Sequence, residues 1–203
     1  LDINAVSLNA KKPFRFTSGI LSPIYTDCRL LISFPKQRKI IKNLYLDAIK
    51  NEQLSFDVVA GTSTAGIPWA SWIADALNLP MIYVRTAQKD HGKRNQIEGL
   101  IKRRQKAIVI EDLISTAGSS IETVKAIRSN GAYVFNIFSI ITYQMKKAED
   151  NFKKNNIKLI TLTDISTIVD VAEKYSHIDK KDQQIVLKWV KDPASWGKKM
   201  RFE

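Results

Sequence analysis

Five short β-rich runs alternate with helical patterns from residue 56 onward, and this alternation restricts the possible folds more than any other feature of the chain. Strands joined through helices of such length need right-handed crossovers, which make the strands parallel within one sheet that helices cover. The predicted strands are Phe56–Ala60, Met81–Val84, Ala107–Ile110, Tyr133–Thr142 and Lys158–Leu162. The predicted helices between them are Gly66–Leu77, Ser119–Ser129 and Met145–Asn155. The sequence therefore predicts an α/β fold with a mainly parallel central sheet flanked by helices.

Three further helices are predicted outside this region, at Pro35–Asn51, Ser166–Lys174 and Lys180–Val190. Pro35 stands at an entry position, where a missing N–H costs nothing. Within the predicted 119–129 helix, an apolar residue recurs every three positions at Ile121, Val124 and Ile127, so one stripe faces the sheet. Asn130-Gly131 then supplies a stop signal.

The composition is that of a globular protein with an excess of positive charge. The 203 residues include 32 Lys and Arg against 20 Asp and Glu, a net charge of +12. This charge suits an anionic partner, whether nucleic acid, a membrane surface or a polyphosphate substrate. No apolar run approaches the roughly 18 residues of a membrane span. The single cysteine, Cys28, cannot form an internal disulfide, so we expect a cytoplasmic protein.

The segment Glu111–Ser120 has the residue order that a sugar phosphate needs. Two carboxylates, Glu111 and Asp112, follow an apolar run and can accept hydrogen bonds from ribose hydroxyls. The small and hydroxyl residues after them let backbone N–H groups close on a phosphate, and the following helix begins with its positive dipole end.

A second loop of this kind is Gly61–Pro68, between a predicted strand and a predicted helix. It lacks the lysine of a Walker A loop and the spacing of a dinucleotide-binding loop, because Ile67 follows Gly66 and the glycines are five positions apart. Both loops follow strands of one parallel sheet, so we expect them to meet at the crevice where such sheets bind ligands.

The long polar connection between Val84 and Ala107 carries the candidate cations Arg85, Lys89 and His91. Pyrophosphate gains negative charge as it leaves a sugar, and mobile cations that close over it stabilise that charge. A solvated loop is the alternative interpretation of the same residues.

Taken together, five segments resemble the orotate phosphoribosyltransferases, a branch of the type I phosphoribosyltransferases. They are Thr17–Arg29, Gly61–Pro68, Lys89–Gly99, Glu111–Ser120, and Lys191-Asp192-Pro193 before Trp196. The resemblance implies the type I phosphoribosyltransferase fold as one domain over residues 1–203. It places a small N-terminal hood at about 1–34, the sheet core at about 56–163 and C-terminal helices at 164–203.

The resemblance also implies a reaction. Orotate and 5-phosphoribosyl 1-diphosphate would give orotidine 5′-monophosphate and pyrophosphate, with Mg²⁺ held mainly by substrate and water. The enzyme would be a homodimer whose subunits share loop 85–99, with neither nucleic acid nor a membrane as partner.

The same resemblance assigns roles to individual residues. The catalytic residues would be Lys89, His91 and Asp112. The diphosphate side would be Arg85, Lys89, His91, Thr64 and Ala65, and the orotate contacts Tyr25, Thr26 and Ser115. The ribose and 5′-phosphate contacts would be Glu111, Asp112, Leu113, Ile114, Ser115, Thr116, Ala117, Gly118 and Ser119.

This chain departs from the family pattern in its charges and in one loop. Thr17, Leu21 and Ala65 stand where family members carry lysine, and Tyr143 stands where some carry arginine. Ala117 occupies a place often held by glycine, so its backbone is expected to be one that alanine tolerates.

Two other functions are compatible with part of the sequence. One is a phosphoribosyltransferase for another base, such as a purine, against which the N-terminal segment argues. The other is a nucleic-acid-binding regulator on the same fold, which the charge of +12 allows. No helix-turn-helix pattern precedes the fold to support the regulator.

Overall fold

A six-stranded sheet forms the centre of the molecule in the computed structural model, which describes residues 1–16, 19–85 and 96–202. The strands lie in the order β10-β9-β8-β5-β6-β7, and every neighbouring pair is parallel except β6 and β7. Their bounds are β5 Val58–Thr62, β6 Met81–Val84, β7 Ile97–Glu98, β8 Lys106–Ile114, β9 Tyr133–Thr142 and β10 Lys158–Asp164. The predicted, mainly parallel α/β sheet is confirmed.

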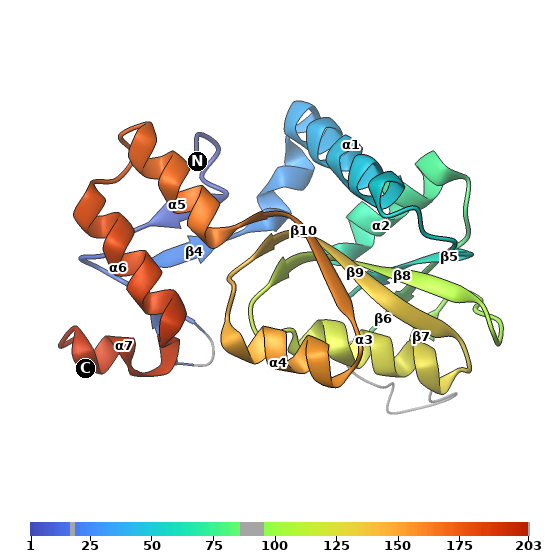
Figure 1. Ribbon diagram of the computed structural model, residues 1–203. Coiled ribbons are helices and arrows are strands. Elements are labelled where there is room, and N and C mark those ends of the chain that lie inside the picture. Colours follow the sequence, from blue (N-terminus) through green and yellow to red (C-terminus); the bar gives the residue numbers. More distant parts are fainter. Residues whose placement is uncertain (17–18, 86–95, 203) are drawn as a thin grey trace.

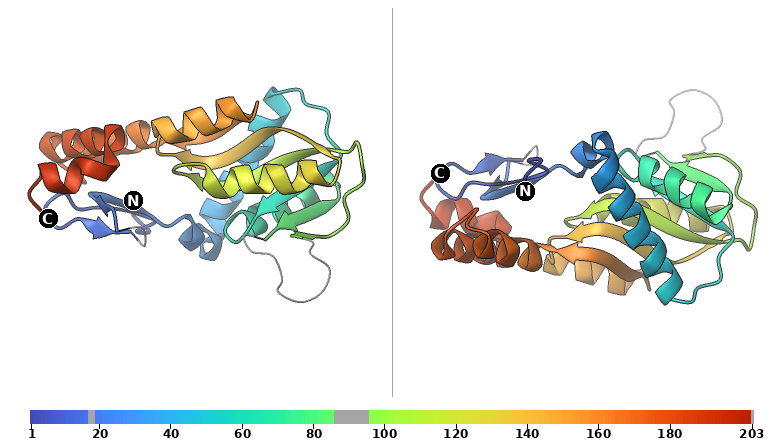
Figure 2. Two further views of the ribbon diagram at one scale, coloured as in Figure 1. Left: turned by 90° about the horizontal axis from the view of Figure 1, so that it is seen from below. Right: turned by 90° about the horizontal axis from the view of Figure 1, so that it is seen from above.

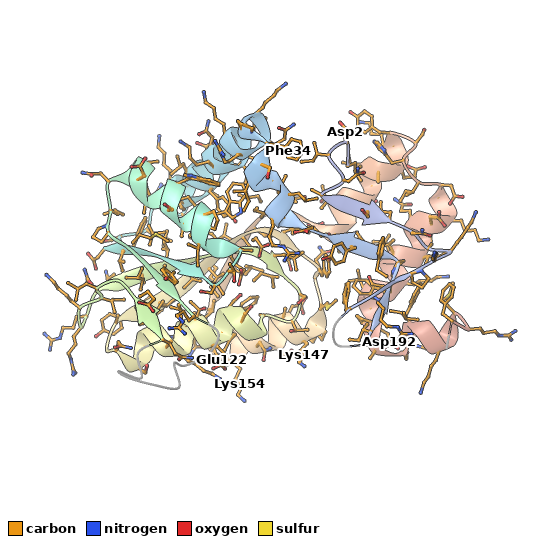
Figure 3. All side chains as sticks on the ribbon, turned by 180° about the vertical axis from the view of Figure 1, so that it is seen from behind. Asp2, Phe34, Glu122, Lys147, Lys154 and Asp192 are labelled. Carbon is orange, nitrogen blue, oxygen red and sulfur yellow. The ribbon has the colours of Figure 1, made fainter. Side chains whose placement is uncertain are left out.

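Helices cover both faces of this sheet (Figure 1). Helices α1 (Pro35–Asn51) and α2 (Gly66–Leu77) lie on one face, and α3 (Gly118–Ser129) and α4 (Lys146–Lys154) lie on the other. The predicted apolar stripe of α3 is buried, since Ile121, Val124 and Ile127 are at most 5% exposed. On the outer side of α3 and α4, charged side chains such as Glu122 and Lys154 point into solvent (Figure 3).

The N-terminal strands lie beside the C-terminal helices, apart from the six-stranded sheet (Figures 1 and 2). The strands form two antiparallel pairs, β1 (Val6–Leu8) with β4 (Ile24–Thr26) and β2 (Phe14–Arg15) with β3 (Leu21–Ser22). A 3₁₀ helix, η1 (Cys28–Ser33), connects them to α1. The C-terminal helices are α5 Ile165–Lys174, α6 Lys180–Lys191 and α7 Pro193–Lys199.

Trp189 of α6 joins these two ends of the chain. Its indole is fully buried and donates a 2.8 Å hydrogen bond from Nε1 to the carbonyl of Leu21. Its ring packs edge-on against Phe16 at 6.1 Å and against Tyr143 at 5.7 Å between centroids. A buried Trp N–H needs such a partner, so the contact sets how α6 lies on the N-terminal strands.

The structure adds β1–β4, η1 and β7 to the predicted elements, and it differs from the prediction most clearly at β8 and α7. The apolar strand was expected at Ala107–Ile110, with the two carboxylates at its end and a loop after them, but β8 continues to Ile114 and contains both carboxylates. Strand β9 pairs with this extension, Glu111 opposite Ser139 and Leu113 opposite Ile141, and so satisfies backbone groups that a loop would leave to water. Helix α7 was not predicted, although Pro193 begins it and Asp192 accepts a 3.3 Å bond from the Ser195 N–H.

Among the described residues, no helix is both long and apolar enough to cross a membrane.

Candidate active site

A cleft of about 350 Å³ lies at the carboxyl ends of β5 and β8. Both predicted anion loops line it, one through Ser63–Ala65 and the other through Glu111–Leu113 and Ser119. The N-terminal segment Thr26–Arg29 lines its remaining side. The expected meeting of the two loops at one crevice of the sheet is therefore confirmed.

Glu111 is 4% exposed and is held from two sides. Its Oε2 accepts a 3.0 Å hydrogen bond from the Ser120 hydroxyl, and its Oε1 accepts the backbone N–H of Asp112 at 3.2 Å. Burial and the neighbouring Asp112 carboxylate raise the pKa of Glu111 well above its ordinary value. The side chain is thus fixed in place and favours its protonated form.

Asp112 lies beside Glu111 and accepts the backbone N–H of Leu113 at 2.8 Å through Oδ1. Burial raises the pKa of Asp112, while hydrogen bonds from Glu111 and Leu113 and the charge of Arg29 favour its ionised form. Burial therefore raises the pKa of both carboxyl groups, and two such groups side by side can accept hydrogen bonds from, and when protonated donate them to, a pair of sugar hydroxyls.

The loop after β8 leads directly into the N-terminus of α3. Ala117 precedes the helix with φ 62° and ψ 15°, which is left-handed backbone. Alanine tolerates this conformation only at a cost of about 1–2 kcal/mol, because its Cβ crowds the neighbouring carbonyl. The side-chain amide of Asn151 donates a 2.8 Å bond to the Thr116 carbonyl and holds the loop against α4. Ala117 offers no side-chain cap to the first N–H groups of α3, and such uncapped N–H groups at a helix start can bind an anion.

The Ser63–Ala65 loop is held close to Glu111 by a glycine. Gly66 begins α2, and a Cβ added to it would collide with the carbonyl oxygen of Ile110. No side chain fits there, so the start of α2 can approach the backbone of β8. The Ser63 N–H also donates to the carbonyl of Val84 at 3.0 Å.

The predicted orotate and diphosphate residues lie in different places. Thr26 lines the cleft, and its buried hydroxyl makes no hydrogen bond to a described residue, although the Tyr143 phenol lies close by. Tyr25, in contrast, packs its ring on Phe14 at 5.7 Å and does not line the cleft. Arg85 pairs with Glu98 at 3.3 Å.

The remaining predicted residues are partly outside the described structure. Lys89 and His91 lie outside the described residues. Ser115 and Thr116 are half-buried in the turn before α3, and Gly118, the first residue of α3, is exposed. Ile114 is fully buried and points into the core.

Sequence reasoning missed Asp27 and Arg29, which line the cleft directly after Thr26. The sequence could have identified them, because both lie at the end of the Thr17–Arg29 segment that resembles the family, but no role was assigned to them there. Tyr143, in the place of a family arginine, is 2% exposed, and burial raises its pKa to about 12.

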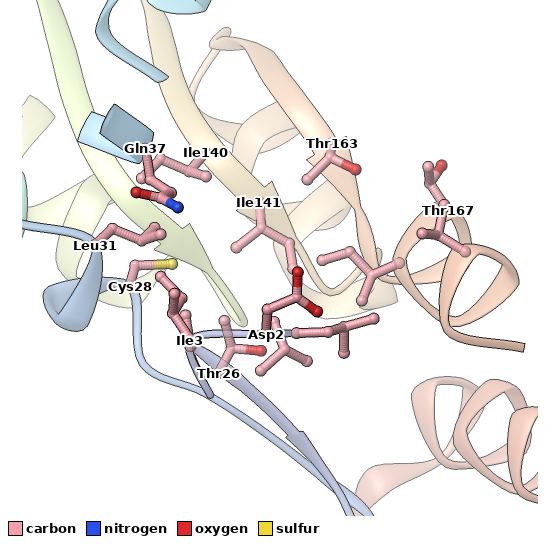
Figure 4. Close-up of a pocket in the computed structure, with 15 residues that line it drawn as sticks. Asp2, Ile3, Thr26, Cys28, Leu31, Gln37, Ile140, Ile141, Thr163 and Thr167 are labelled. Atoms are coloured by element: carbon pink, nitrogen blue, oxygen red, sulfur yellow. The ribbon is translucent and has the colours of Figure 1, made fainter. Parts of the chain in front are cut away.

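A second cavity of about 350 Å³ lies behind the cleft, between the N-terminal residues and the ends of β9 and β10 (Figure 4). Thr26 and Cys28 line both spaces. Among the described residues that line the second cavity, the ionisable side chains are the carboxyl group of Asp2 and the thiol of Cys28, so an anionic substrate fits it poorly.

Comparison with known proteins agrees with this geometry. The model of the phosphoribosyl transferase domain family matches residues 33–176. The orotate phosphoribosyltransferase of Coxiella burnetii is 50% identical over 196 residues, which are 97% of this chain and 94% of that protein. The chain belongs to the orotate phosphoribosyltransferase family.

Two further relatives support this membership. The orotate phosphoribosyltransferase of Enterococcus faecalis (strain OG1RF) is 48% identical over 198 residues, covering 98% of this chain and 94% of its own. The crystal structure of the orotate phosphoribosyltransferase from Aeropyrum pernix superposes with a TM-score of 0.75 at 26% identity, covering 88% of this chain and 96% of that one. The type I phosphoribosyltransferase fold is therefore confirmed.

Proposed function

We propose that this orotate phosphoribosyltransferase family member transfers the phosphoribosyl group of 5-phosphoribosyl 1-diphosphate to orotate in pyrimidine biosynthesis. The products are orotidine 5′-monophosphate and pyrophosphate. One observation carries the proposal: a single cleft is lined by the Ser63–Ala65 loop, the Glu111–Asp112 pair and the N-terminal segment at Thr26. During the transfer, C1′ of the ribose lies between the leaving diphosphate and the attacking base, and each of these three groups would contact a different part of the cleft lining.

Each wall has a chemical task. The Ser63–Ala65 loop binds the diphosphate, Glu111 and Asp112 bind the ribose hydroxyls, and the turn at Ser115–Ser119 with the α3 N-terminus binds the 5′-phosphate. Thr26 contacts orotate. These groups hold the C1′ carbon and the orotate nitrogen in line, which removes most of the entropy cost of a two-substrate reaction. Lys89 and His91 stabilise the charge that builds on pyrophosphate as its bond to C1′ breaks.

Mg²⁺ fits this cleft as a partner of the substrate. The carboxyl oxygens of Asp27, Glu111 and Asp112 are hard ligands of the kind that Mg²⁺ prefers. The described residues contain no cluster of three or more ligating side chains, so the diphosphate and water would supply most of the ligands. Bound in this way, the ion would supply positive charge that offsets the charge of the leaving pyrophosphate.

The working enzyme is proposed to be a homodimer in which loop 85–99 of one subunit reaches the cleft of its partner. This part of the proposal rests on the family resemblance, whereas the expected cytoplasmic location rests on the lone Cys28, which agrees with a reducing compartment.

The activity is tested by following the loss of orotate absorbance with 5-phosphoribosyl 1-diphosphate and Mg²⁺. Hypoxanthine, guanine, adenine and uracil serve as competing bases. We expect turnover of orotate alone, and none in excess chelator, with recovery when Mg²⁺ is restored. Turnover of a purine in place of orotate would favour the alternative base, and undiminished activity in chelator would exclude the role of the metal.

A further inference from the structure

The charge of the cleft does not match the charge of its proposed substrates. Its described lining contains three carboxyl groups, those of Asp27, Glu111 and Asp112, and one positive side chain, that of Arg29. Orotate and 5-phosphoribosyl 1-diphosphate are both anions. Arg29 is thus the cation that the described part of the chain contributes to this space, and no role was assigned to it from the sequence.

Arg29 is held in a fixed orientation by Asp27. Asp27 caps η1 and accepts the backbone N–H of Arg29 at 3.1 Å. Its carboxylate also accepts two hydrogen bonds from one side of the Arg29 guanidinium, from Nε to Oδ1 at 2.7 Å and from Nη2 to Oδ2 at 3.0 Å. A two-point contact of this kind fixes the plane of the guanidinium, so little rotamer freedom remains to be lost when a ligand binds.

The contact with Asp27 leaves part of the guanidinium available. A guanidinium has five N–H groups that form two forks, one at Nε and Nη2 and one at the far end between Nη1 and Nη2. Asp27 occupies the first fork. The Arg29 side chain is 62% exposed, against 22% for Asp27. The far fork can therefore reach a ligand in the cleft, and its shape matches two coplanar oxygens.

The place of Arg29 favours the base over the diphosphate as its ligand. Only Asp27 and Cys28 separate it from Thr26, whose buried hydroxyl has no hydrogen-bond partner among the described residues. Both residues come from the N-terminal wall of the cleft, whereas the anion-binding loops come from the sheet. A planar ligand against this wall would meet the guanidinium fork of Arg29 close to Thr26.

We propose that Arg29, oriented by Asp27, binds the carboxylate of orotate through its far fork and so selects a carboxylated base. Asp27 is then a positioning residue that acts through Arg29. The inference rests on the proposed function, and it adds a specificity-determining residue to that site.

Steady-state kinetics of Arg29→Gln test it, with the Michaelis constants for orotate and for 5-phosphoribosyl 1-diphosphate measured separately. Loss of a charge-assisted two-point contact should raise KM for orotate by about 10-fold to 100-fold, with a much smaller change for the diphosphate. Arg29→Lys keeps the charge without the fork and should lie in between. Asp27→Asn should raise KM for orotate by less than Arg29→Gln, because the guanidinium remains.

Arg103→Gln is the matched control, since Arg103 is exposed and lies outside the cleft lining. It removes the same charge and should leave both constants unchanged. Far-ultraviolet circular dichroism and thermal unfolding verify that each variant is folded.

The outcomes separate this inference from the function itself. An unmodified chain without activity on orotate would remove the proposed function. An active chain whose Arg29→Gln variant keeps its KM for orotate would overturn the role of Arg29 alone. A rise confined to KM for 5-phosphoribosyl 1-diphosphate would overturn it as well and would assign the cation to the diphosphate.

Discussion

The phenol of Tyr45 on α1 donates a 2.6 Å hydrogen bond to the backbone carbonyl of Glu111, 66 residues further along the chain. Tyr45 is fully buried, and burial raises its pKa well above the ordinary value, so it remains a donor. The bond crosses from a helix to the strand position that carries the acidic pair. Helix α1, which lies on the face of the sheet opposite α3, thus helps to position Glu111 and Asp112.

Tyr45→Phe should therefore weaken both folding and turnover. It leaves a buried carbonyl without its partner, at a cost of about 1–3 kcal/mol in the free energy of unfolding. It should also lower kcat/KM, because the acidic pair loses a support. Urea unfolding and steady-state kinetics measure the two effects. Tyr175→Phe is the control: Tyr175 is 66% exposed, so its change should stay within about 0.5 kcal/mol. Equal, small effects of both variants would contradict the role of Tyr45.

The raised pKa of Glu111 predicts how stability depends on pH. Above its unfolded value of 4.5 and up to its higher folded value, the folded state holds a proton that the unfolded state has released. The free energy of unfolding should therefore fall as pH rises through this window. Glu111→Gln should remove that part of the slope and gain stability relative to the unmodified chain towards neutral pH. Unfolding measured at several pH values tests this, and the exposed Glu122→Gln should keep the slope. The same slope in the Glu111→Gln variant would disprove the assignment to Glu111.

The left-handed backbone of Ala117 predicts a stabilising substitution. Glycine has no Cβ to crowd the carbonyl at φ 62°, so Ala117→Gly should raise the free energy of unfolding by about 1 kcal/mol. Ala126→Gly, in the regular part of α3, should lower it by about 1 kcal/mol or more. Thermal or urea unfolding of the pair gives the comparison. Destabilisation by both substitutions would mean that the backbone at Ala117 is not strained.

Subunit mixing tests the proposed sharing of loop 85–99. Lys89→Ala should lower kcat more than ground-state binding, on the order of 10²-fold, because a cation closing on pyrophosphate acts mainly in the transition state. Asp112→Asn should lower turnover, because the ribose loses a carboxylate partner, while the variant remains folded. If the loop crosses between subunits, a hybrid of the two chains has one intact site and regains activity. Lack of recovery after verified subunit exchange would show that each subunit uses its own loop.

The sequence alone determined the elements whose signals are local. Helices α1 and α2 and strands β6 and β9 have the predicted bounds. Their signals are local: a proline at the start of a helix, the regular spacing of apolar residues, and runs of β-branched residues each act within a few positions. The order of the motifs along the chain was enough to predict the family and the meeting of two anion loops at one edge of the sheet.

The tertiary structure decided what depends on residues far apart in the sequence. The carboxylates stand within β8 because β9 continues to pair with it, and the N-terminal strands rest on α6 because the Trp189 indole finds the carbonyl of Leu21. Arg29 enters the cleft because η1 connects the N-terminal strands to α1 beside the sheet. Strand pairing, burial and side-chain hydrogen bonds of this kind join segments up to 168 residues apart. The local sequence pattern does not determine which distant partner each polar group binds.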